Sequence, residues 1–456
     1  MISFGTIRQK DCSGLSRREL LRIGTVGAFG LRLPDLLRVR AAGDEGRPPA
    51  RGMILLWLWG GPSQMDTFDL KPKAPIEYRG PYSPIHTNVP GIEISELLPR
   101  LALRADRYAI VRSLQHGTND HGIGGTVGLT SSQAGGASLG GQIVPGRLQP
   151  THGAIVSRVL GNQSELPPFV SIGGRLHQGR RPITGEGGGS LGSVYDPFRL
   201  DYDPEDGVRI PVLEIQQGLT GDIIGNRRAL LREIDQTARR LDESRTLQRF
   251  DEVYQQAYSL LLTPAARRFF DVGQESEAVR RAYGSFRFGQ CCLMARRLIE
   301  AGVPFVQVNW SSHVEPVEDG GDGGWDMHDR NFSILQDRHA WMLDQSLTAL
   351  LDDLQERGLL DSTLVVTAGE FGRTPKINPR AGRDHWEKCY SAVVAGGGLR
   401  TGQVIGASDP LGNYPASRPL SPGDLATTFY ERLGIGTTQL TQLGLVPPGS
   451  LIEELT

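Results

Sequence analysis

A continuous apolar run, MILLWLW at residues 53–59, constrains this chain more than any other feature of its sequence. It ends at a pair of glycines, which is typical of a strand that is buried on both faces and stopped by a turn. Further short, largely apolar runs resemble it, at residues 108–111, 168–173, 303–310, 363–368 and 391–397. Strands of this kind occur in sheets covered on both sides, so the sequence predicts a buried sheet.

Segments with helical spacing of apolar residues lie between several of these runs. Residues 277–301 form one such segment, and residues 332–357 form another. The alternating order of helices and strands predicts an α/β fold with a doubly wound, mostly parallel sheet flanked by helices. We expect one domain over residues 52–456, interrupted at about 212–272 by a charged helical insertion.

The N-terminal segment predicts export. SRRELLRIG followed by the uncharged TVGAFGL is typical of a twin-arginine signal, and residues 39–41 precede an acceptable cleavage position. We expect a signal peptide at 1–41, a linker at 42–51, and a periplasmic or secreted protein that passes through the twin-arginine translocase. An ordinary amphipathic helix is the alternative. No stable membrane span is expected, because the charge-free core has about half of the ~20 residues that a span needs.

Charge and cysteine content argue against other classes of protein. The formal net charge of −2 does not suit a nucleic-acid-binding protein, whose affinity depends on clustered positive charge. The four cysteines have no C-x-x-C spacing, so we expect neither a disulfide framework nor a thiolate zinc site.

Acidic residues and histidines gather directly after the predicted strands. In an open α/β sheet, ligands bind beyond the carboxyl ends of the strands, so these side chains are expected at one rim. Five of the nine histidines are among them, namely His116, His121, His313, His328 and His385. The accompanying carboxylates include Asp66, Asp69, Asp120, Asp326, Glu370 and Asp384.

This mixture of side chains predicts a divalent metal site. Carboxylate oxygen and imidazole nitrogen suit zinc, manganese or iron, and calcium is kept open as well. Asp326 and His328 are two positions apart, so in an extended segment both point the same way and can grip one ion. The alternative is a rim of hydrogen-bonded loops without metal, since such residues also cap helices and form turns.

Five motifs in this order, after a twin-arginine start, resemble one family: GGPSQMDTFD, HGTNDHG, GGWDMHD, GEFGRTP and GRDHW. The chain resembles the bacterial domain-of-unknown-function family fifteen-oh-one, which is placed in the alkaline phosphatase/sulfatase superfamily. The resemblance spans nearly the whole mature chain. It implies an alkaline-phosphatase-like fold with one or two metal ions that acts on phosphate or sulfate esters.

The resemblance also implies metal ligands. Asp66 is similar in position to the acidic ligand after the first strand, and Asp326 with His328 to the Asp and His of one metal site. Glu370 lies where the superfamily has an acidic ligand, although Phe371 follows it in place of the usual histidine. His385 resembles the final metal-binding histidine, with Asp384 beside it as a further ligand or as the group that orients the imidazole.

The sequence indicates the catalytic residues less clearly than the metal ligands. No C-x-P-S-R motif is present, and counting back from GLTS places His121 where the superfamily has its nucleophile. His121 or His116 is therefore expected as a general acid/base or, as the lesser alternative, as the covalent nucleophile, with Thr118 as the nearest hydroxyl and Ser63 as a more distant one. Arg373 is expected to clamp the anion, and a surface ion pair is its alternative role.

Two functions follow from these expectations. The first is an exported metal-dependent hydrolase of a small anionic ester or of a sulfated or phosphorylated glycan. The second is a non-catalytic envelope protein on the same fold that binds metal or glycan. The many Asp, Glu and His residues at the predicted rim favour the enzyme. The lack of a recognisable nucleophile in the sequence favours the binding protein.

Overall fold

The structure, a computed structural model, describes residues 49–204, 207–209, 268–316 and 322–456. The predicted signal peptide at 1–41 lies outside the described residues, as do most of the linker at 42–51 and most of the helical insertion at 212–272. Among the residues that are described, no helix is long and apolar enough to cross a membrane.

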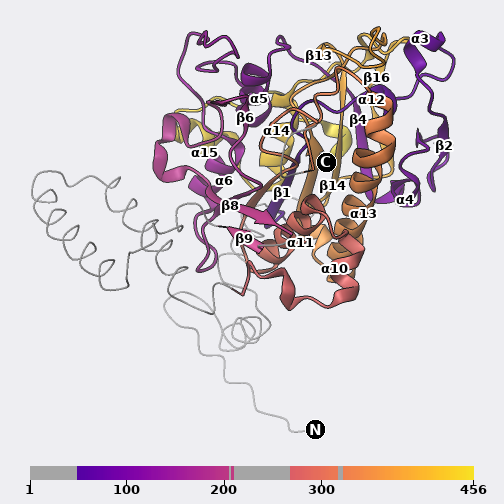
Figure 1. The fold of residues 1–456 in the computed structure, drawn as a ribbon. Coiled ribbons are helices and arrows are strands. Elements are labelled where there is room, and N and C mark those ends of the chain that lie inside the picture. The colour runs from indigo at the N-terminus through magenta and orange to yellow at the C-terminus, as the bar shows by residue number, and fades with distance from the viewer. Residues whose placement is uncertain (1–48, 205–206, 210–267, 317–321) are drawn as a thin grey trace, which may run out of the picture. The chain divides into compact units, whose positions relative to one another are not determined.

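A nine-stranded sheet forms the centre of the described domain, in the order β15-β4-β14-β11-β1-β10-β5-β8-β9 (Figure 1). In chain order its strands are β1 (Gly52–Trp57), β4 (Tyr108–Leu114), β5 (Phe169–Ile172), β8 (Phe198–Asp203), β9 (Gly207–Arg209), β10 (Phe305–Asn309), β11 (Thr363–Ala368), β14 (Tyr390–Gly396) and β15 (Gln403–Ile405). Within this sheet, β9 and β14 run against the other strands. The predicted α/β fold with a mostly parallel, helix-flanked sheet is confirmed, and each of the six predicted runs overlaps a strand.

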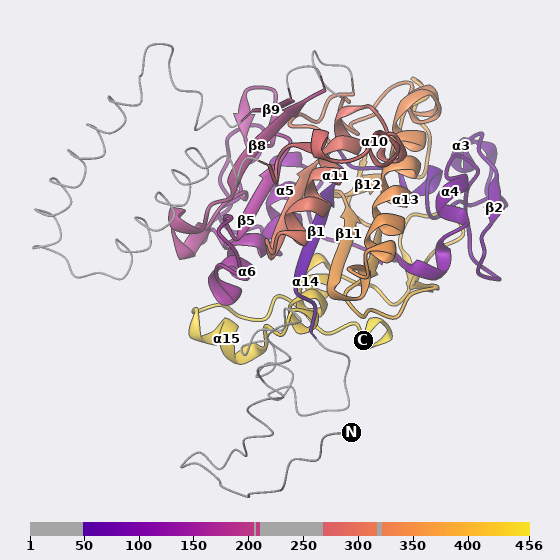
Figure 2. The ribbon, with the colours of Figure 1, turned by 90° about the horizontal axis from the view of Figure 1, so that it is seen from below.

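Alternate residues of β1 enter two separate hydrophobic cores. Ile54 and Leu56 pack with residues of α11 (Arg287–Glu300) and α13 (Ala340–Glu356). Met53 and Leu55 pack with residues of α6 (His152–Leu160) and α14 (Pro422–Arg432). Figure 2 shows the two helix layers on opposite sides of the strands. Burying each such side chain stabilises the fold by about 1.5–3 kcal/mol, which is why a strand of this sheet has no polar face.

The two predicted helices are both present but interrupted. The pattern at 277–301 divides into α10 (Glu277–Tyr283) and α11, because Gly284 adopts a φ of 96° that breaks the helical hydrogen bonding. The pattern at 332–357 divides into α12 (Asn331–Ile334), a π-helical turn at Leu335–His339, and α13. The apolar spacing predicted the buried faces but not these breaks.

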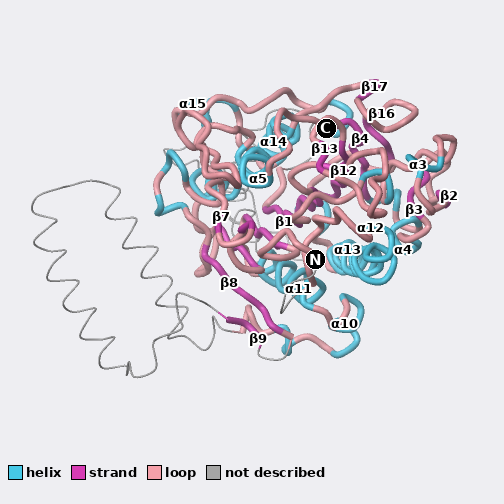
Figure 3. The backbone as a smooth tube through the Cα atoms, turned by 45° about the horizontal axis from the view of Figure 1, so that its top comes forward, coloured by secondary structure: helices cyan, strands magenta, loops and turns pink. Residues whose placement is uncertain are grey.

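Helix α5 (His121–Thr130; Figure 3) packs closely against the side chains at and just after the end of β1, and this packing positions the predicted rim. A Cβ atom on Gly128 would come within 2.2 Å of the Trp57 ring, and one on Gly125 within 2.8 Å of the Trp59 ring. Only glycine fits at such contacts. The Asp120 side chain caps the helix by accepting from the amide of Ile123 at 3.1 Å. The first residue of α5, His121, is thereby held close to the carboxyl end of β1.

Candidate metal centre

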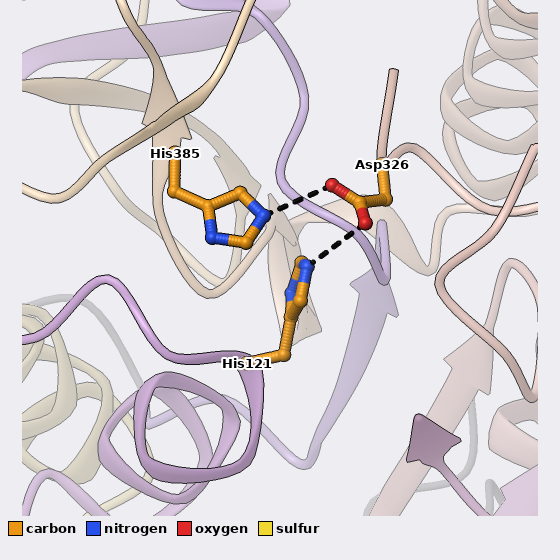
Figure 4. Close-up of side chains that lie close together, drawn as sticks. All are labelled: His121, Asp326 and His385. Atoms are coloured by element: carbon orange, nitrogen blue, oxygen red, sulfur yellow. Dashed lines mark hydrogen bonds and ion pairs between the residues drawn. The ribbon is translucent and has the colours of Figure 1, made fainter. Parts of the chain in front are cut away.

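Three side chains from distant parts of the chain converge at the carboxyl ends of the central strands: His121, Asp326 and His385 (Figure 4). One ligand atom from each lies within 4.8 Å of the others. Nε2 of His121 is 3.3 Å from Oδ2 of Asp326, and Nε2 of His385 is 3.0 Å from Oδ1 of the same carboxylate. Figure 4 shows the Asp326 carboxylate facing both imidazole rings. These three residues can hold a metal ion.

His328 borders the same cluster. Its Nε2 lies 3.0 Å from Oδ1 of Asp326 and 2.9 Å from Nε2 of His385. The expectation that Asp326 and His328 point the same way therefore agrees with the geometry. His328 is also the most exposed member, with a third of its side chain accessible, whereas the side chain of His121 is fully buried. The cluster is closed on the α5 side and reachable from solvent on the His328 side.

Each imidazole of the cluster is anchored through its other nitrogen. Nδ1 of His121 lies 2.6 Å from Oε1 of Glu370, and Nδ1 of His328 lies 2.7 Å from Oδ1 of Asp384. Nδ1 of His385 lies 2.7 Å from the backbone oxygen of Asn119. All three partners accept, so we assign the proton of each neutral ring to Nδ1 and a lone pair to Nε2. Metal-binding histidines are held in this way in general.

The arrangement fits a cation. Nε2 of His121 is buried and makes no hydrogen bond, and its approach to Asp326 is an ion-pair distance without hydrogen-bond geometry. In the neutral state, two lone pairs face each other between His328 and His385 at 2.9 Å. A shared cation would satisfy these nitrogen atoms and the carboxylate together. The separations of 2.9–3.3 Å are close to the ~3.3 Å between ligands on a tetrahedral ion with bonds of about 2.0–2.1 Å.

Burial and the charges within the cluster shift the pKa values of its members in opposite directions. Burial lowers the pKa of His121, but Asp326 and Glu370 outweigh it and raise that pKa to about 9. Burial lowers the pKa of His385 to about 4, against the opposing effect of Asp326. Burial disfavours ionised Asp326, yet Arg373 and the three histidines hold the pKa of this carboxyl far below its usual range. Asp326 is thus a permanent anion around which cations gather.

Glu370 and Phe371 form the floor of the site. The fully buried Glu370 carboxylate accepts from the amide of Gly60 at 3.0 Å as well as contacting His121. The ring of Phe371 packs 4.9 Å from that of His121 and 4.7 Å from that of His385. Glu370 therefore orients a ligand rather than joining the cluster directly, and Phe371 replaces the expected histidine with a hydrophobic support for two imidazoles.

The predicted role of Arg373 as an anion clamp does not fit the structure. Its guanidinium is fully buried and donates to the backbone oxygens of Gly60, Gly61 and Arg383. It also donates to Oδ1 of Asp326 at 2.6 Å. With these donors engaged, Arg373 fixes Asp326 and the loop after β1 instead of facing an open site.

Asp66, predicted as a metal ligand, lies apart from the cluster. Arg383 binds both of its carboxylate oxygens, at 2.8 and 3.0 Å. Ser63 and Asn331 donate to Oδ2 at 2.6 and 2.9 Å. Arg383 and Asp66 are both buried, so this is an interior ion pair in which the carboxylate already has its cation. Ser63, the more distant candidate nucleophile, is committed to the same network.

His116 and Thr118 support the site instead of entering the cluster. Nε2 of His116 lies 2.5 Å from the backbone oxygen of Glu370, and burial lowers the pKa of this imidazole. The Thr118 hydroxyl accepts from the amide of Asp120 at 3.3 Å. Both contacts brace the turn that leads into α5. Asp384, expected beside His385, instead orients His328 and accepts from Asn378 at 3.2 Å.

Some members of the site were not identified from the sequence. The carbonyl oxygen of Asn119 holds His385, and a backbone group carries no sequence signal. Arg383, which neutralises Asp66, was visible only as one of several basic residues in RTPKINPRAGR. The glycines of HGIGG did carry a signal, since closely spaced glycines in a helix indicate close packing.

Comparison with protein families confirms the resemblance carried by the motifs. The family model described as "Protein of unknown function (DUF1501)" matches residues 50–445. No curated protein matches the chain.

Solved structures with similar folds share little sequence with this chain. Ps i-CgsB has a TM-score of 0.42 and 12% identity, over 88% of this chain and 75% of that chain. The lipoteichoic acid synthase LtaP from Listeria monocytogenes has a TM-score of 0.36 and 11% identity, over 89% of this chain and 76% of that chain. PsFucS1 sulfatase from Pseudoalteromonas sp. has a TM-score of 0.36 and 12% identity, over 89% of this chain and 72% of that chain. Scores this low carry no conclusion about activity.

Proposed function

This chain belongs to the DUF1501 family of proteins of unknown function, and we propose that it is a metal-dependent hydrolase of phosphate or sulfate esters. The observation that carries the proposal is the convergence of His121, Asp326 and His385, with ligand atoms within 4.8 Å of one another. Their nitrogen and oxygen donors suit zinc or manganese. The residues that orient the ligands, Glu370 and the carbonyl of Asn119, support a site built for an ion.

The open side of the cluster favours catalysis over a structural role. Structural metal sites are closed by four protein ligands, whereas catalytic sites keep a position for water or substrate. Here the fully buried His121 closes one side, and the partly exposed His328 and His385 border the other. A divalent ion at this position would polarise a non-bridging ester oxygen and lower the pKa of a bound water.

We assign separate roles to the chain's own residues. His121, Asp326 and His385 hold the ion, and Glu370 keeps His121 in the tautomer that binds through Nε2. His328 is placed at the open side and held through Nδ1 by Asp384, and its contact with Asp326 raises its pKa. In its protonated state it would give the Nε2 proton to the leaving oxygen as the bond of that oxygen to phosphorus or sulfur breaks. Arg373 keeps Asp326 ionised and in position.

Turnover and metal content, measured on the same preparations, test the proposal. We expect the protein to bind a divalent metal and to hydrolyse 4-nitrophenyl phosphate or 4-nitrophenyl sulfate. His121→Ala is expected to lose both metal and turnover, while His86→Ala, which alters an exposed histidine in β2 (Pro84–His86), keeps both. Absence of turnover of both esters by a metal-loaded wild-type protein would contradict the hydrolase assignment.

One variant separates the two roles open to His328. If it transfers a proton, His328→Gln keeps the wild-type metal content and loses about 10²-fold or more in kcat. If it is instead a fourth ligand, the same variant loses metal and turnover together. The second outcome would remove the proton-transfer role and retain the metal centre.

A non-catalytic metal- or glycan-binding protein remains the second candidate. It is favoured by one specific feature: within the described residues, no serine or threonine hydroxyl bonds to a member of the cluster. The two nearby arginines, Arg373 and Arg383, are also fully engaged in internal contacts. Metal binding without turnover of either ester would favour this candidate.

We further propose that the protein is exported through the twin-arginine pathway to the periplasm or beyond. The support is the sequence SRRELLRIG before an uncharged segment. Replacing Arg17 and Arg18 by Lys is expected to leave the full-length protein in the cytoplasm. Equal export of this variant and the unaltered chain would contradict the proposal.

A further inference from the structure

A small hairpin beside the candidate metal centre carries three exposed arginines. It consists of β6 (His177–Gln178) and β7 (Arg181–Pro182), and we call residues 175–182 the cationic hairpin. Arg175, Arg180 and Arg181 are all exposed within it. Within the described part of the chain, none of these three arginines forms an ion pair with a carboxylate. Gly179, at a φ of 52°, forms the turn that presents Arg180 at the tip.

The cationic hairpin emerges from the same edge of the sheet as the metal centre. It follows β5, which runs parallel to β10, and β10 in turn runs parallel to β1. Two strand spacings of about 4.8 Å separate β5 from β1, so the hairpin base lies about 10 Å across the sheet from the loop after β1. Figure 1 places β6 close to α5, the helix that begins with His121.

Direct contacts fix the base of the hairpin against the site. The indole Nε1 of Trp59 donates to the backbone oxygen of His177 at 3.0 Å, and the Trp59 ring lies 5.5 Å from the ring of His121. The amide of His177 donates to the backbone oxygen of Ser312 at 2.8 Å. One aromatic ring therefore separates the cationic hairpin from a proposed metal ligand.

The neighbouring carboxylate does not neutralise the hairpin. Glu186 is buried, accepts from the amide of Leu176 at 2.9 Å, and pairs with Arg199 at 3.1 Å. Arg175 lowers the pKa of Glu186 by its charge without a direct contact, and Arg180 and Arg181 have no acidic partner among the residues that the structure describes. Arg181 is placed by the turn at Gly141, where an added Cβ would meet its guanidinium. The hairpin thus presents guanidinium groups to solvent that no described carboxylate pairs with.

We infer that the cationic hairpin binds a second anionic group of the substrate, so that the preferred substrate is a glycan that carries several sulfate or phosphate groups. This inference rests on the proposed ester hydrolase function, because the first anionic group is the ester at the metal centre. Planar guanidinium groups bind sulfate and phosphate oxygens in pairs of hydrogen bonds. A substrate with a single anionic group would gain nothing from the hairpin.

The charge pattern favours a glycan over a nucleic acid. A nucleic-acid-binding protein typically neutralises six to ten phosphates over a broad basic face. This chain has a formal net charge of −2, and its exposed basic residues near the site are few: those of the hairpin, with Lys376 and Arg380 in the loop before His385. Such a surface suits a glycan, in which the sulfate or phosphate groups are substituents spaced along a neutral backbone.

Three polymers that share one backbone provide the test: dextran sulfate, phosphorylated dextran and uncharged dextran. The protein without its predicted signal peptide is titrated with each polymer at several salt concentrations. We expect it to bind one or both charged polymers and not dextran. The double variant Arg180→Gln/Arg181→Gln is expected to bind at least about tenfold more weakly. The slope of its log affinity against log salt concentration should correspond to about two fewer released counterions. The charge-matched control Arg51→Gln/Arg400→Gln alters two exposed arginines before β1 and after β14, at the opposite edge of the sheet, and should bind as the wild type does.

The outcomes separate this inference from the proposed function. Equal binding by the hairpin variant and the control would overturn the hairpin assignment, whatever the turnover of aryl esters. Tighter binding of double-stranded DNA than of either charged dextran would overturn the glycan assignment. Hairpin-dependent binding of a charged dextran, in a protein that turns over no ester, would retain the hairpin as a binding element and contradict the hydrolase. Tighter binding of dextran sulfate would identify sulfate as the preferred group, and tighter binding of phosphorylated dextran would identify phosphate.

Discussion

Oε1 of Glu370 lies 2.6 Å from Nδ1 of His121, and both side chains are fully buried. A carboxylate in this position does two things for the imidazole. It fixes the ring so that Nε2 points at Asp326, and it makes the ring a stronger donor to a cation. Glu370, just after β11, thus supports the candidate metal centre through its contact with His121.

This contact predicts a loss of metal affinity when the charge of Glu370 is removed. Glu370→Gln keeps a side-chain oxygen of similar shape but loses the negative charge. We expect metal affinity to fall about 10–100-fold, measured by competition with a chromophoric chelator. Glu93→Gln, at an exposed site in β3 (Glu93–Ser95), is the matched control and should bind metal as the wild type does. An unchanged affinity in Glu370→Gln would contradict the orienting role.

Close packing of α5 predicts a strong effect of one added methyl group. Gly128→Ala would place a Cβ within 2.2 Å of the Trp57 ring, so the helix or the indole must shift. We expect the free energy of unfolding to fall by about 1–3 kcal/mol, measured by denaturant titration, together with weaker metal binding because His121 starts the same helix. Gly140→Ala is the control, because its nearest atom is the Ser138 hydroxyl at 3.7 Å. Equal stability of the two variants would contradict this view of α5.

The buried pair of Arg383 and Asp66 predicts an asymmetry between single and double variants. Arg383→Met leaves a buried carboxylate without its cation, which should cost about 3–5 kcal/mol of stability. Arg383→Met combined with Asp66→Asn removes both charges and should recover a large part of that loss. The half-exposed pair of Arg418 and Glu454 offers the comparison, since Arg418→Gln should change stability by less than about 1 kcal/mol. Additive effects in the double variant would show that the pair is not coupled.

Two buried histidines outside the metal centre predict how stability depends on pH. Burial lowers the pKa of His152 to about 4, and burial together with Arg338 lowers that of His339 to about 4. A group whose pKa is lower in the folded state contributes stability that is full above its unfolded value of about 6.5 and is lost as the pH falls toward 4. We expect each residue to account for a loss of about 3 kcal/mol over that interval.

Urea unfolding at pH 7, 5.5 and 4.5 measures this dependence. His152→Gln should be less stable at pH 7, because it loses the contact of Nδ1 with the Tyr430 hydroxyl at 2.7 Å, and should lose less stability on acidification. The exposed His86 provides the matched variant, and His86→Gln should keep the slope of the wild type. A slope in His152→Gln as steep as that of the wild type would exclude His152 as its source.

The sequence predicted the sheet well because the evidence for it is local. Each buried strand is a short apolar run, and apolar residues on both faces are required where helices cover both sides. The pairing of Asp326 with His328 was also predictable, because it depends only on residues two positions apart in an extended segment. The position of the site at the carboxyl ends of the strands follows from the topology of the sheet.

The errors concern side chains whose partners lie far away in the chain. Arg373 and Arg383 occur in one basic segment and have the same chemistry, but both are buried by contacts with the loop after β1. Asp66 has the sequence context of a ligand and becomes the partner of Arg383, 317 residues away. The sequence does not encode these contacts locally, so it identified the residues of the rim better than their roles.

Elemental analysis of the purified mature protein tests the central claim most directly. The protein is equilibrated with zinc and manganese, dialysed, and compared with Asp326→Asn and with the exposed-site control Glu93→Gln. We predict close to one bound ion per chain in the wild type and in the control, and a loss of most of the metal in Asp326→Asn, because Asp326 provides the charge at the centre of the cluster. Equal metal content in Asp326→Asn and the wild type, or no bound metal in the wild type, would contradict the metal centre.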